Sequence, residues 1–477
     1  MNLLRGSLLA LGMCLIGYTG LAQEKKDAVP VKTDTLKLSI AQAQQYAFEN
    51  NRTVKSSRLD IESAKKKVWE TTAIGLPQFT ASADYQHLFT IPTLSLGGTT
   101  SLAVDQSISG SSAITADNIR NNQVRLAYTP MDPIKMGVPD NITYTFTLSQ
   151  LIFSGEYIVG LQASRIYKEL SEKSSVKTEQ TTKESVADGY YLVLVLDENI
   201  KVLKESIKVV EKTYADMSGM NKQGFAESSD VDQMKINKAN IQTMINSLTS
   251  QRDVAMKLLQ LQLGVDFTKP VALSDSLSGI LKTDNNLGAI ASNFDINNNV
   301  DYQLALTQEG LMSLSLRREQ SKFLPTISAF YRHQEYMKEP PINFQPKDVL
   351  GASLNIPIFT SGSRISKVGQ AKIDLQKATL AKENANQALT MEFERAKNDY
   401  ITAYNNFVNN KESMELSNSI YNKNIIKFRE GVGTSLELTQ SQNQYLTAQS
   451  NYYNSVLSLL NAKAKLDRIL LKYEKPN

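Results

Sequence analysis

Histidine and cysteine are residue types that commonly transfer protons or bind metals, and this chain has two histidines and one cysteine. His87 and His333 both fall in segments that predict strands. Neither has a carboxylate or a second histidine nearby at metal-ligand spacing. We therefore expect both to line or border a strand surface. Glu392 and Glu394 are expected on solvated helix faces, so the sequence predicts no acid–base pair, no enzyme activity and no cofactor.

The segment Gly431-Val432-Gly433 could suggest a phosphate-binding loop, but no strand precedes it and a third glycine is missing. We interpret it as a turn between two helices, and Gly224 marks a similar turn earlier in the chain. Each turn is followed by serine or threonine residues that can cap the next helix. The residues from Thr434 to Glu437 have the pattern of a capping box.

The N-terminal residues 1–22 have the pattern of a secretory signal, with Arg5 followed by an apolar stretch too short to span a membrane. Cleavage after Ala22 would remove Cys14. Met13 stands where lipidation signals place a small residue, so no lipid anchor is expected. The chain has 52 basic and 48 acidic residues, and this near-neutral balance argues against nucleic-acid binding. No later stretch is apolar enough to predict a spanning helix.

The chain is internally duplicated. Residues 148–155 return, with one insertion, as residues 354–362. Further aligned pairs are Tyr214 with Tyr421 and Gly224 with Gly431 (421 − 214 = 431 − 224 = 207), and Leu76-Pro77 with Leu324-Pro325 (324 − 76 = 248). A unit of roughly 200 residues is too long for a solenoid repeat and indicates two fused halves.

Four segments alternate between apolar and polar residues, as amphipathic strands do. They are residues 78–90, 141–153, 325–336 and 348–359. In the second of them, Ile142, Tyr144 and Phe146 alternate with threonines. Such strands could be half-buried in a soluble sheet or could span a membrane. Two hairpins alone do not make a stable sheet in water, so we expect closure with other chains.

The remaining segments predict long helices. Apolar residues recur every seven positions with few exceptions, which predicts packed, supercoiled helices. One such stripe in the second half is Phe393, Tyr400, Phe407, Met414, Tyr421 and Phe428. The predicted helices are 38–74, 156–218 and 227–264 in the first half, and 295–322, 363–428 and 434–471 in the second.

The predicted organisation is therefore a helix-strand-strand-long helix-helix unit that occurs twice. Its parts are a signal peptide (1–22), an N-terminal linker (23–37), a first repeat (38–265), an inter-repeat linker (266–294) and a second repeat (295–472). The first repeat contains an insertion at 91–140 that is rich in Gly, Ser, Thr and Pro. This insertion either shields the mouth of the strand region or is a disordered decoration.

Several short motifs in a fixed order carry a resemblance to a known family. They are residues 38–43 with Asn50-Asn51, Leu76-Pro77, Phe153-Ser154-Gly155, Leu324-Pro325, Ile358-Phe359, Gly362 and the stretch 428–471. In this order, spacing and duplication the chain resembles the TolC family of outer membrane efflux proteins. The residues Pro77, Pro325, Gly155 and Gly362 then mark the junctions between strands and helices.

The resemblance implies a mainly α protein with a membrane β-barrel portion. A homotrimer would close one twelve-stranded barrel in the cell outer membrane, with four strands per chain, and a helical tunnel would continue it across the periplasm. The implied function is a passive exit duct of a tripartite efflux pump or type I secretion system. The implied partners are outer-membrane lipid, a periplasmic adaptor (membrane fusion protein) and an inner-membrane pump of RND or ABC type.

The resemblance also indicates a gate at the tips of the tunnel, where Gly224, Gly431 and Gly433 form the turns. The family carries acidic residues there, and the matching positions are Asp230 and Glu437. Gln440 occupies the family's second acidic position, and Gly433 replaces a basic residue that can latch the tip, although Arg429 or Lys222 could substitute. Both acids also suit helix starts, so gating and capping remain open alternatives.

Two other functions fit parts of the pattern. A coiled-coil scaffold without a transport role would lack the threonine-faced strands. A porin-like diffusion channel would have many strands and little helix. The sequence does not specify whether the cargo is a drug, a metal or a protein.

Overall fold

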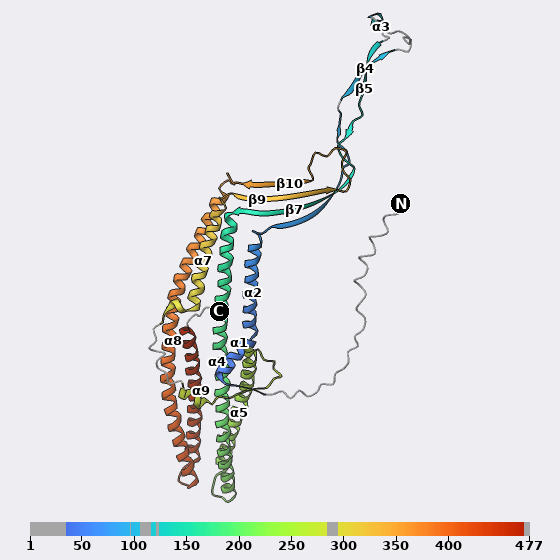
Figure 1. Ribbon diagram of the computed structural model, residues 1–477. Coiled ribbons are helices and arrows are strands. Elements are labelled where there is room, and N and C mark those ends of the chain that lie inside the picture. The colour runs from blue at the N-terminus through green and yellow to red at the C-terminus, as the bar shows by residue number, and fades with distance from the viewer. Residues whose placement is uncertain (1–34, 96, 105–115, 121–123, 284–293, 472–477) are drawn as a thin grey trace, which may run out of the picture.

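The computed structural model describes residues 35–95, 97–104, 116–120, 124–283 and 294–471. The expected signal segment with Cys14, most of the linker 23–37, and parts of the expected segments 91–140 and 266–294 lie outside these residues. In the described part, long helices run side by side, a sheet lies across one end of them, and a hairpin projects beyond the sheet (Figure 1).

Helices make up most of the described chain, and corresponding helices of the two halves match in length. They are α2 (Arg52–Ala73) and α7 (Val300–Ser321) with 22 residues each, α4 (Gly155–Lys222) and α8 (Ser363–Arg429) with 68 and 67, and α5 (Ser228–Leu263) and α9 (Ser435–Leu470) with 36 each. At 1.5 Å per residue, α4 and α8 each extend about 100 Å. Within the described residues, no helix combines the length and apolar character needed to cross a membrane.

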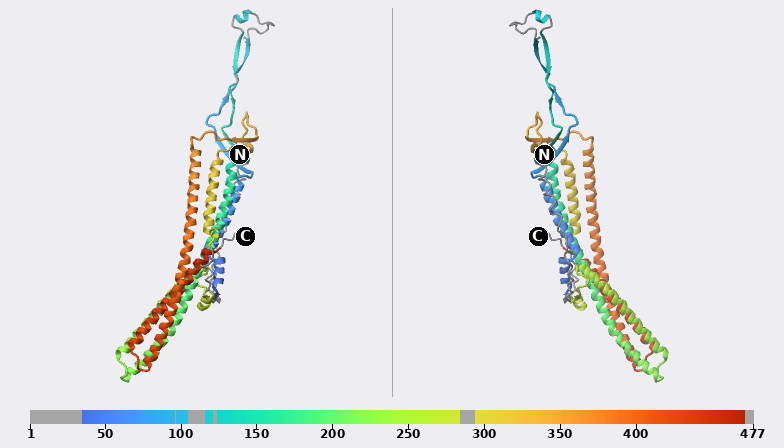
Figure 2. Two further views of the ribbon diagram at one scale, coloured as in Figure 1. Left: turned by 90° about the vertical axis from the view of Figure 1, so that its left-hand side faces the viewer. Right: turned by 90° about the vertical axis from the view of Figure 1, so that its right-hand side faces the viewer.

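The helices form a wall whose members change along its length. Near the sheet, α2, α4, α7 and α8 pack in that order, and further away the order is α5, α4, α9 and α8. In both side views the lower part of the wall leans away from the upper part (Figure 2). Smaller elements pack at the middle: α1 (Ile40–Asn50), α6 (Leu277–Thr283), and the parallel pair β1 (Leu36–Leu38) and β8 (Val271–Leu273).

The predicted helix 38–74 is wrong in one respect, because Asn51 divides it into α1 and α2. The Asn51 side chain accepts hydrogen bonds from the backbone N–H groups of Thr53 and Val54, which starts a new helix, and its Nδ2 donates to the Gln262 carbonyl at 2.6 Å. The second half repeats this arrangement. Asn299 caps α7 after a short 3₁₀ turn (Ile296–Asn298), so that helix begins five residues later than predicted (300 − 295 = 5).

One antiparallel sheet contains all four predicted strands, in the order β10-β9-β7-β2. Its members are β2 (Gln78–His87), β7 (Asp140–Ser154), β9 (Thr326–Tyr336) and β10 (Asp348–Asn355). The strand predicted to reach residue 359 ends at Asn355, because Asn355 pairs with Thr326, the first residue of β9. The residues that follow have no neighbouring strand within the described chain.

The insertion 91–140 contains a ladder of short strands. β3 (Thr93–Leu94) pairs with β6 (Ile134–Lys135), and β4 (Gly98–Val104) pairs with β5 (Val124–Pro130). A short helix, α3 (Ala116–Arg120), lies between β4 and β5 in the sequence. The hairpin rises from the end of the sheet that is away from the helices (Figure 1). Its described part is therefore an ordered extension of β2 and β7.

The largest apolar core lies at the middle of the wall and is centred on Tyr190 of α4, which is fully buried. The Tyr190 hydroxyl lies 3.0 Å from both the Leu38 carbonyl and the Asp275 carboxylate, and the Asp275 backbone N–H donates to it at 3.3 Å. Asp275 also accepts from the Ile40 N–H at 2.7 Å. Burial raises the pKa of Tyr190. This neutral phenol therefore joins α4 to the segments that flank β1 and β8.

We predict that Tyr190→Phe lowers the free energy of unfolding by about 1–3 kcal/mol, because it leaves the half-buried Asp275 carboxylate and the buried Leu38 carbonyl short of a donor. The adjacent Tyr191 is a matched control, since its hydroxyl has no hydrogen-bond partner within the described residues. Tyr191→Phe should change stability much less. Thermal unfolding in detergent, followed by circular dichroism at the helix band, measures both; equal losses would contradict the assignment.

Candidate functional site

One face of the sheet is apolar and exposed. Leu350, Tyr331, Leu148 and Phe79 form a row across the four strands, with exposed fractions of 82%, 43%, 43% and 69%. Neighbouring positions on this face include Ala81, Ala83, Tyr144, Phe146, Ile327 and Leu354. An exposed apolar surface that spans four strands is unusual for a protein surface in water and marks a contact with lipid or another protein.

The opposite face of the same sheet is polar. It includes Thr80, Ser82, Asp84, Gln86, Asn141, Thr143, Thr145, Thr147, Ser149, Ser328, Arg332, Gln334, Ser353 and Asn355. Bulky rings interrupt it at Phe330 and Tyr336. Phe330 lies over Gly351, where an added Cβ would be 2.6 Å from its ring, so this glycine is needed for close packing. The two faces thus present different chemistry on either side of one layer.

Both histidines lie at the end of the apolar face that is away from the helices, each beside an aspartate. Asp140 Oδ1 accepts from His87 Nδ1 at 2.7 Å and from the Tyr85 hydroxyl at 2.9 Å. The expectation that no carboxylate lies near the histidines is wrong, because the aspartate comes from the neighbouring strand, where sequence spacing does not reveal it. Asp140 links the two strands at the point where the hairpin leaves the sheet.

The second half builds the same cluster from matching residues. Asp348 Oδ1 accepts from His333 Nδ1 at 2.7 Å and from the Tyr331 hydroxyl at 2.6 Å. Glu335 is 3.8 Å from the other ring nitrogen of His333. No group of three or more potential metal ligands occurs in the part of the chain that the structure describes. Each cluster joins two paired strands through its aspartate.

The junctions between strands and helices contain the predicted glycines and prolines. Pro77 and Pro325 immediately precede β2 and β9. Gly155 is the first residue of α4, and an added Cβ there would lie 2.7 Å from Leu324, so only glycine fits without movement. Gly362 precedes α8 with φ +79°, a conformation that favours glycine. These positions allow the chain to turn sharply from strand to helix.

The far end of the helical wall consists of two helix-to-helix turns. Gly224 (φ +81°) lies between α4 and α5, and Gly431 (φ +74°) lies between α8 and α9. Gly433 is not in the left-handed region, but an added Cβ would be 3.1 Å from the Phe428 nitrogen, so the close backbone approach favours glycine there. Large apolar side chains are exposed at these turns: Phe225 by 76%, Val432 by 77% and Leu436 by 64%.

The acidic tip residues have different environments. Asp230, in the first turn of α5, accepts a short hydrogen bond from the Ser435 hydroxyl, which joins the two tips. Glu437 is exposed and completes the capping box with Thr434, with both hydrogen bonds at 3.2 Å. Gln440 is exposed on α9.

No basic residue latches the tip acids in the described chain. Within the described residues, neither Arg429 nor Lys222 forms an ion pair with Asp230 or Glu437. The Ser435 hydroxyl, at the start of α9, instead links Asp230 of α5 to the second tip.

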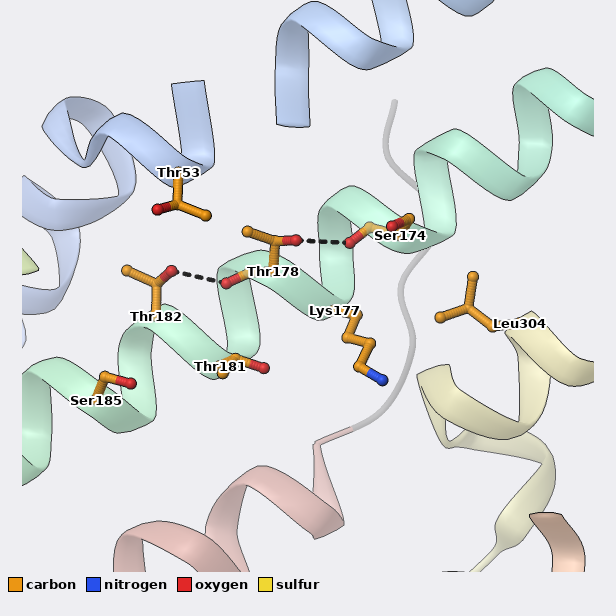
Figure 3. A pocket seen from close by; sticks show the side chains of 8 residues that line it. All are labelled: Thr53, Ser174, Lys177, Thr178, Thr181, Thr182, Ser185 and Leu304. Atoms are coloured by element: carbon orange, nitrogen blue, oxygen red, sulfur yellow. Dashed lines mark hydrogen bonds between the residues drawn. The ribbon is translucent and has the colours of Figure 1, made fainter. Parts of the chain in front are cut away.

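A hollow of about 600 Å³ lies along α4, with Thr53 of α2 and Leu304 of α7 at its sides (Figure 3). Most of its lining is hydroxyl groups of α4: Ser174, Thr178, Thr181, Thr182 and Ser185. Thr178 and Thr182 donate to carbonyls of their own helix at 3.0 and 2.8 Å. Lys177, its one charged lining residue, pairs with Asp301 at 2.5 Å. The charge of this lysine is therefore balanced by a neighbouring carboxylate.

Half-buried ion pairs connect α4, α8 and α9. Arg468 pairs with Glu184 at 2.6 Å and with Glu392 at 2.9 Å. Burial, and then the negative charge of Glu184, raises the pKa of Asp188 to about 6. Glu392 is therefore half-buried and paired, whereas Glu394 is exposed as expected. The two ion pairs of Arg468 hold the three helices together.

A model of the outer membrane efflux protein family matches residues 316–470. A search of curated proteins finds no significant match. The solved outer membrane protein VceC from Vibrio cholerae is 14% identical with a TM-score of 0.66, and the alignment covers 91% of this chain and 96% of that one. The CmeC outer membrane channel of Campylobacter jejuni is 16% identical with a TM-score of 0.68, and the alignment covers 95% and 94%.

The open state of the MtrE outer membrane channel of Neisseria gonorrhoeae is 13% identical with a TM-score of 0.62, and the alignment covers 95% of this chain and 96% of that one. At these identities the likeness establishes the fold, which is the mainly helical fold of outer-membrane channels. The resemblance to the TolC-like outer membrane efflux proteins is therefore confirmed, in sequence over residues 316–470 and in fold over at least 91% of the chain.

Proposed function

We propose that this chain forms the trimeric outer-membrane exit duct of a tripartite efflux pump or a type I secretion system. The observation that carries the proposal is the four-stranded sheet with one exposed apolar face and one polar face, attached to helices about 100 Å long. In this arrangement the apolar face contacts lipid, the polar face lines a water-filled lumen, and the helices extend into the periplasm. The family match and the channel fold support it.

A single chain does not close this sheet. β2 and β10 are edge strands, and lipid leaves no water to satisfy their backbone groups. Three copies would supply twelve strands. A barrel of that size has a wider lumen than an eight-stranded barrel, in which side chains fill the interior. Ile356, Ile358 and Phe359 follow β10 with exposed fractions of 53%, 93% and 84%, so they are available to pair with the next copy.

The internal duplication indicates a register for the seam between copies. Within the chain, Leu148 of β7 pairs with Tyr331 of β9, and Ser149 with Phe330. Residues 148–153 match 354–359 with an offset of 206, so Ser149 corresponds to Asn355 (149 + 206 = 355). Leu76-Pro77 matches Leu324-Pro325 with an offset of 248, so Phe330 corresponds to Ser82 (330 − 248 = 82). The pair Ser149–Phe330 within one chain therefore predicts the pair Asn355–Ser82 between copies. Both lie on the polar face, so this register keeps each face continuous.

We predict that the double variant Ser82→Cys/Asn355→Cys, in a Cys14→Ser background, forms disulfides between copies on oxidation. Side-by-side positions in such a pair have Cα atoms about 4.5–5.5 Å apart, within disulfide range. Non-reducing gels should show dimer and trimer bands. The matched control Ser82→Cys/Ser353→Cys is displaced by about 6.6 Å along the strand and should not cross-link.

A monodisperse monomer in mild detergent by light scattering would overturn the trimer. Cross-linking of the control pair alone would retain the trimer and reject the register.

The tips form the periplasmic entrance in this proposal. Threefold symmetry would place three Glu437 carboxylates around one axis, with Asp230 nearby, as a negative collar that favours cations. Gln440 leaves the collar thinner than one with a second acidic position. The Ser435–Asp230 hydrogen bond would hold the closed tip, and the exposed Phe225, Val432 and Leu436 would contact the periplasmic adaptor.

We predict that Glu437→Gln, which keeps an acceptor for the cap, lowers the cation-to-anion permeability ratio about two- to fivefold, as loss of ~0.5–1 kcal/mol of Coulomb attraction would. Gln440→Glu should raise the ratio. Glu394→Gln, an exposed acid on α8, is the matched control and should have no effect. Single-channel recording measures all three; unchanged selectivity and unchanged block by trivalent cations in Glu437→Gln would leave this residue only a capping role.

The β4–β5 hairpin would leave the barrel on the extracellular side, since it rises from the sheet end opposite the helices (Figure 1). We expect it to shield or narrow the outer mouth, so deletion of residues 96–136 should raise conductance and antibody access. Conductance and access equal to those of the full chain would reject this role.

The two other functions have less support. A coiled-coil scaffold does not account for the exposed apolar sheet face, and a porin-like channel does not account for a mainly helical fold. Recovery of the cognate pump from the native membrane, using the assembled duct as bait, would identify the cargo class and distinguish an RND from an ABC pump.

A further inference from the structure

Charged side chains are scarce on the polar face of the sheet. Among the residues of β2, β7, β9 and β10 on this face, only Asp84 and Arg332 carry a charge, and the others are mostly threonine, serine, asparagine and glutamine. Arg332 lies in a row between Val349 of β10 and Thr147 of β7. The guanidinium therefore projects from a neutral wall.

Arg332 has no partner within the described residues. Its Nε is buried without a hydrogen-bond acceptor, and the neighbouring Gln334 has a buried side-chain oxygen without a donor. No ion pair involving Arg332 occurs in the described part of the chain. A half-buried guanidinium that lacks an acceptor is energetically costly and readily binds an anionic group.

The one acid on the same face is too far away to neutralise it. Asp84 aligns with Thr143 and Tyr336, so it lies two strands from Arg332 and four residues along β9. This separation is about 16 Å, roughly twice the screening length at physiological salt. If Ser82 pairs with Asn355 of the neighbouring copy, Asp84 pairs with Ser353. This Asp84 is again two strands away from β9 and four residues along it from Arg332. The duplication therefore brings no acid to it.

The surroundings also give the site a shape. Phe330, two residues along β9 on the same face, lies over Gly351 of β10. The Phe330 and Arg332 positions are therefore about 6.6 Å apart along β9 on one face, opposite Gly351 and Val349 of β10. Arginine matches the planar, two-oxygen geometry of carboxylate, sulfate and phosphate groups better than lysine does.

We propose that Arg332 determines the ionic specificity of the strand portion of the duct by binding carboxylate, sulfate or phosphate groups of passing solutes. The inference rests on the proposed trimeric duct, in which three Arg332 side chains face one lumen. Such a ring favours anions, in contrast to the acidic tips.

The test is single-channel recording in planar bilayers with the full chain. Arg332→Gln should lower the anion-to-cation permeability ratio about two- to fivefold and weaken block by inorganic phosphate by a similar factor. Arg332→Lys should keep the ratio but lose part of the phosphate block. Lys338→Gln removes the same charge from an exposed position after β9 and should change neither.

A rescue experiment separates charge from fold. Arg332→Cys, made in a Cys14→Ser background, should regain anion preference when a cationic thiosulfonate is attached, and an anionic reagent should not restore it. Normal conductance with unchanged permeability and phosphate block in Arg332→Gln would overturn the inference while leaving the duct intact. Absence of conductance in the unmodified protein and in every variant would instead overturn the duct and the inference with it.

Discussion

The register of four antiparallel strands is the constraint on which the rest of the molecule depends. Side chains alternate between the two faces, so a shift of one residue would move every threonine of one strand to the apolar face. Hydrogen bonds fix this register at the outer end. Asp140 accepts hydrogen bonds from His87 and Tyr85, and in the second half Asp348 accepts them from His333 and Tyr331. At the inner end, the register shifts between Leu151 and Phe153, and pairing then continues to Ser154, immediately before α4 begins. A single sheet can therefore present an apolar face on one side and a polar face on the other.

Charge is distributed unequally along the same path. The acids at the tips are tied to local structure, Glu437 by its capping box and Asp230 by the Ser435 hydroxyl. Arg332, at the opposite end, has no acceptor for its Nε among the described residues. The hydroxyl-lined hollow beside α4 lies between them, and its single lysine is neutralised by Asp301. In the proposed duct, a solute would therefore meet acidic side chains at the tips and an arginine on the polar face of the sheet.

The sequence predicted the helices well because heptad stripes and the absence of proline leave few alternatives: the long helix expected at 156–218 spans 155–222, and the one at 434–471 spans 435–470. The errors came from interactions between distant residues. Asn51 divides a helix by capping α2, and its side chain is also held by a carbonyl 211 residues away. Asp140 lies 53 residues from His87 and meets it only across the strand pair. The unpaired state of Arg332 likewise depends on the register of four strands, which no single segment encodes.

The long helices also make the molecule a lever. Neither α4 nor α8 contains proline, so each can act as a stiff rod. Tyr190 fixes α4 to the packed elements at mid-length, about 48 Å from Lys222 at the tip. A rotation of only about 5° around this fulcrum would displace the tip by roughly 4 Å, more than the length of a hydrogen bond. Rupture of the contact between Asp230 and Ser435 thus requires very little movement at the centre, and a force applied at the tips gains a mechanical advantage over the rest of the wall.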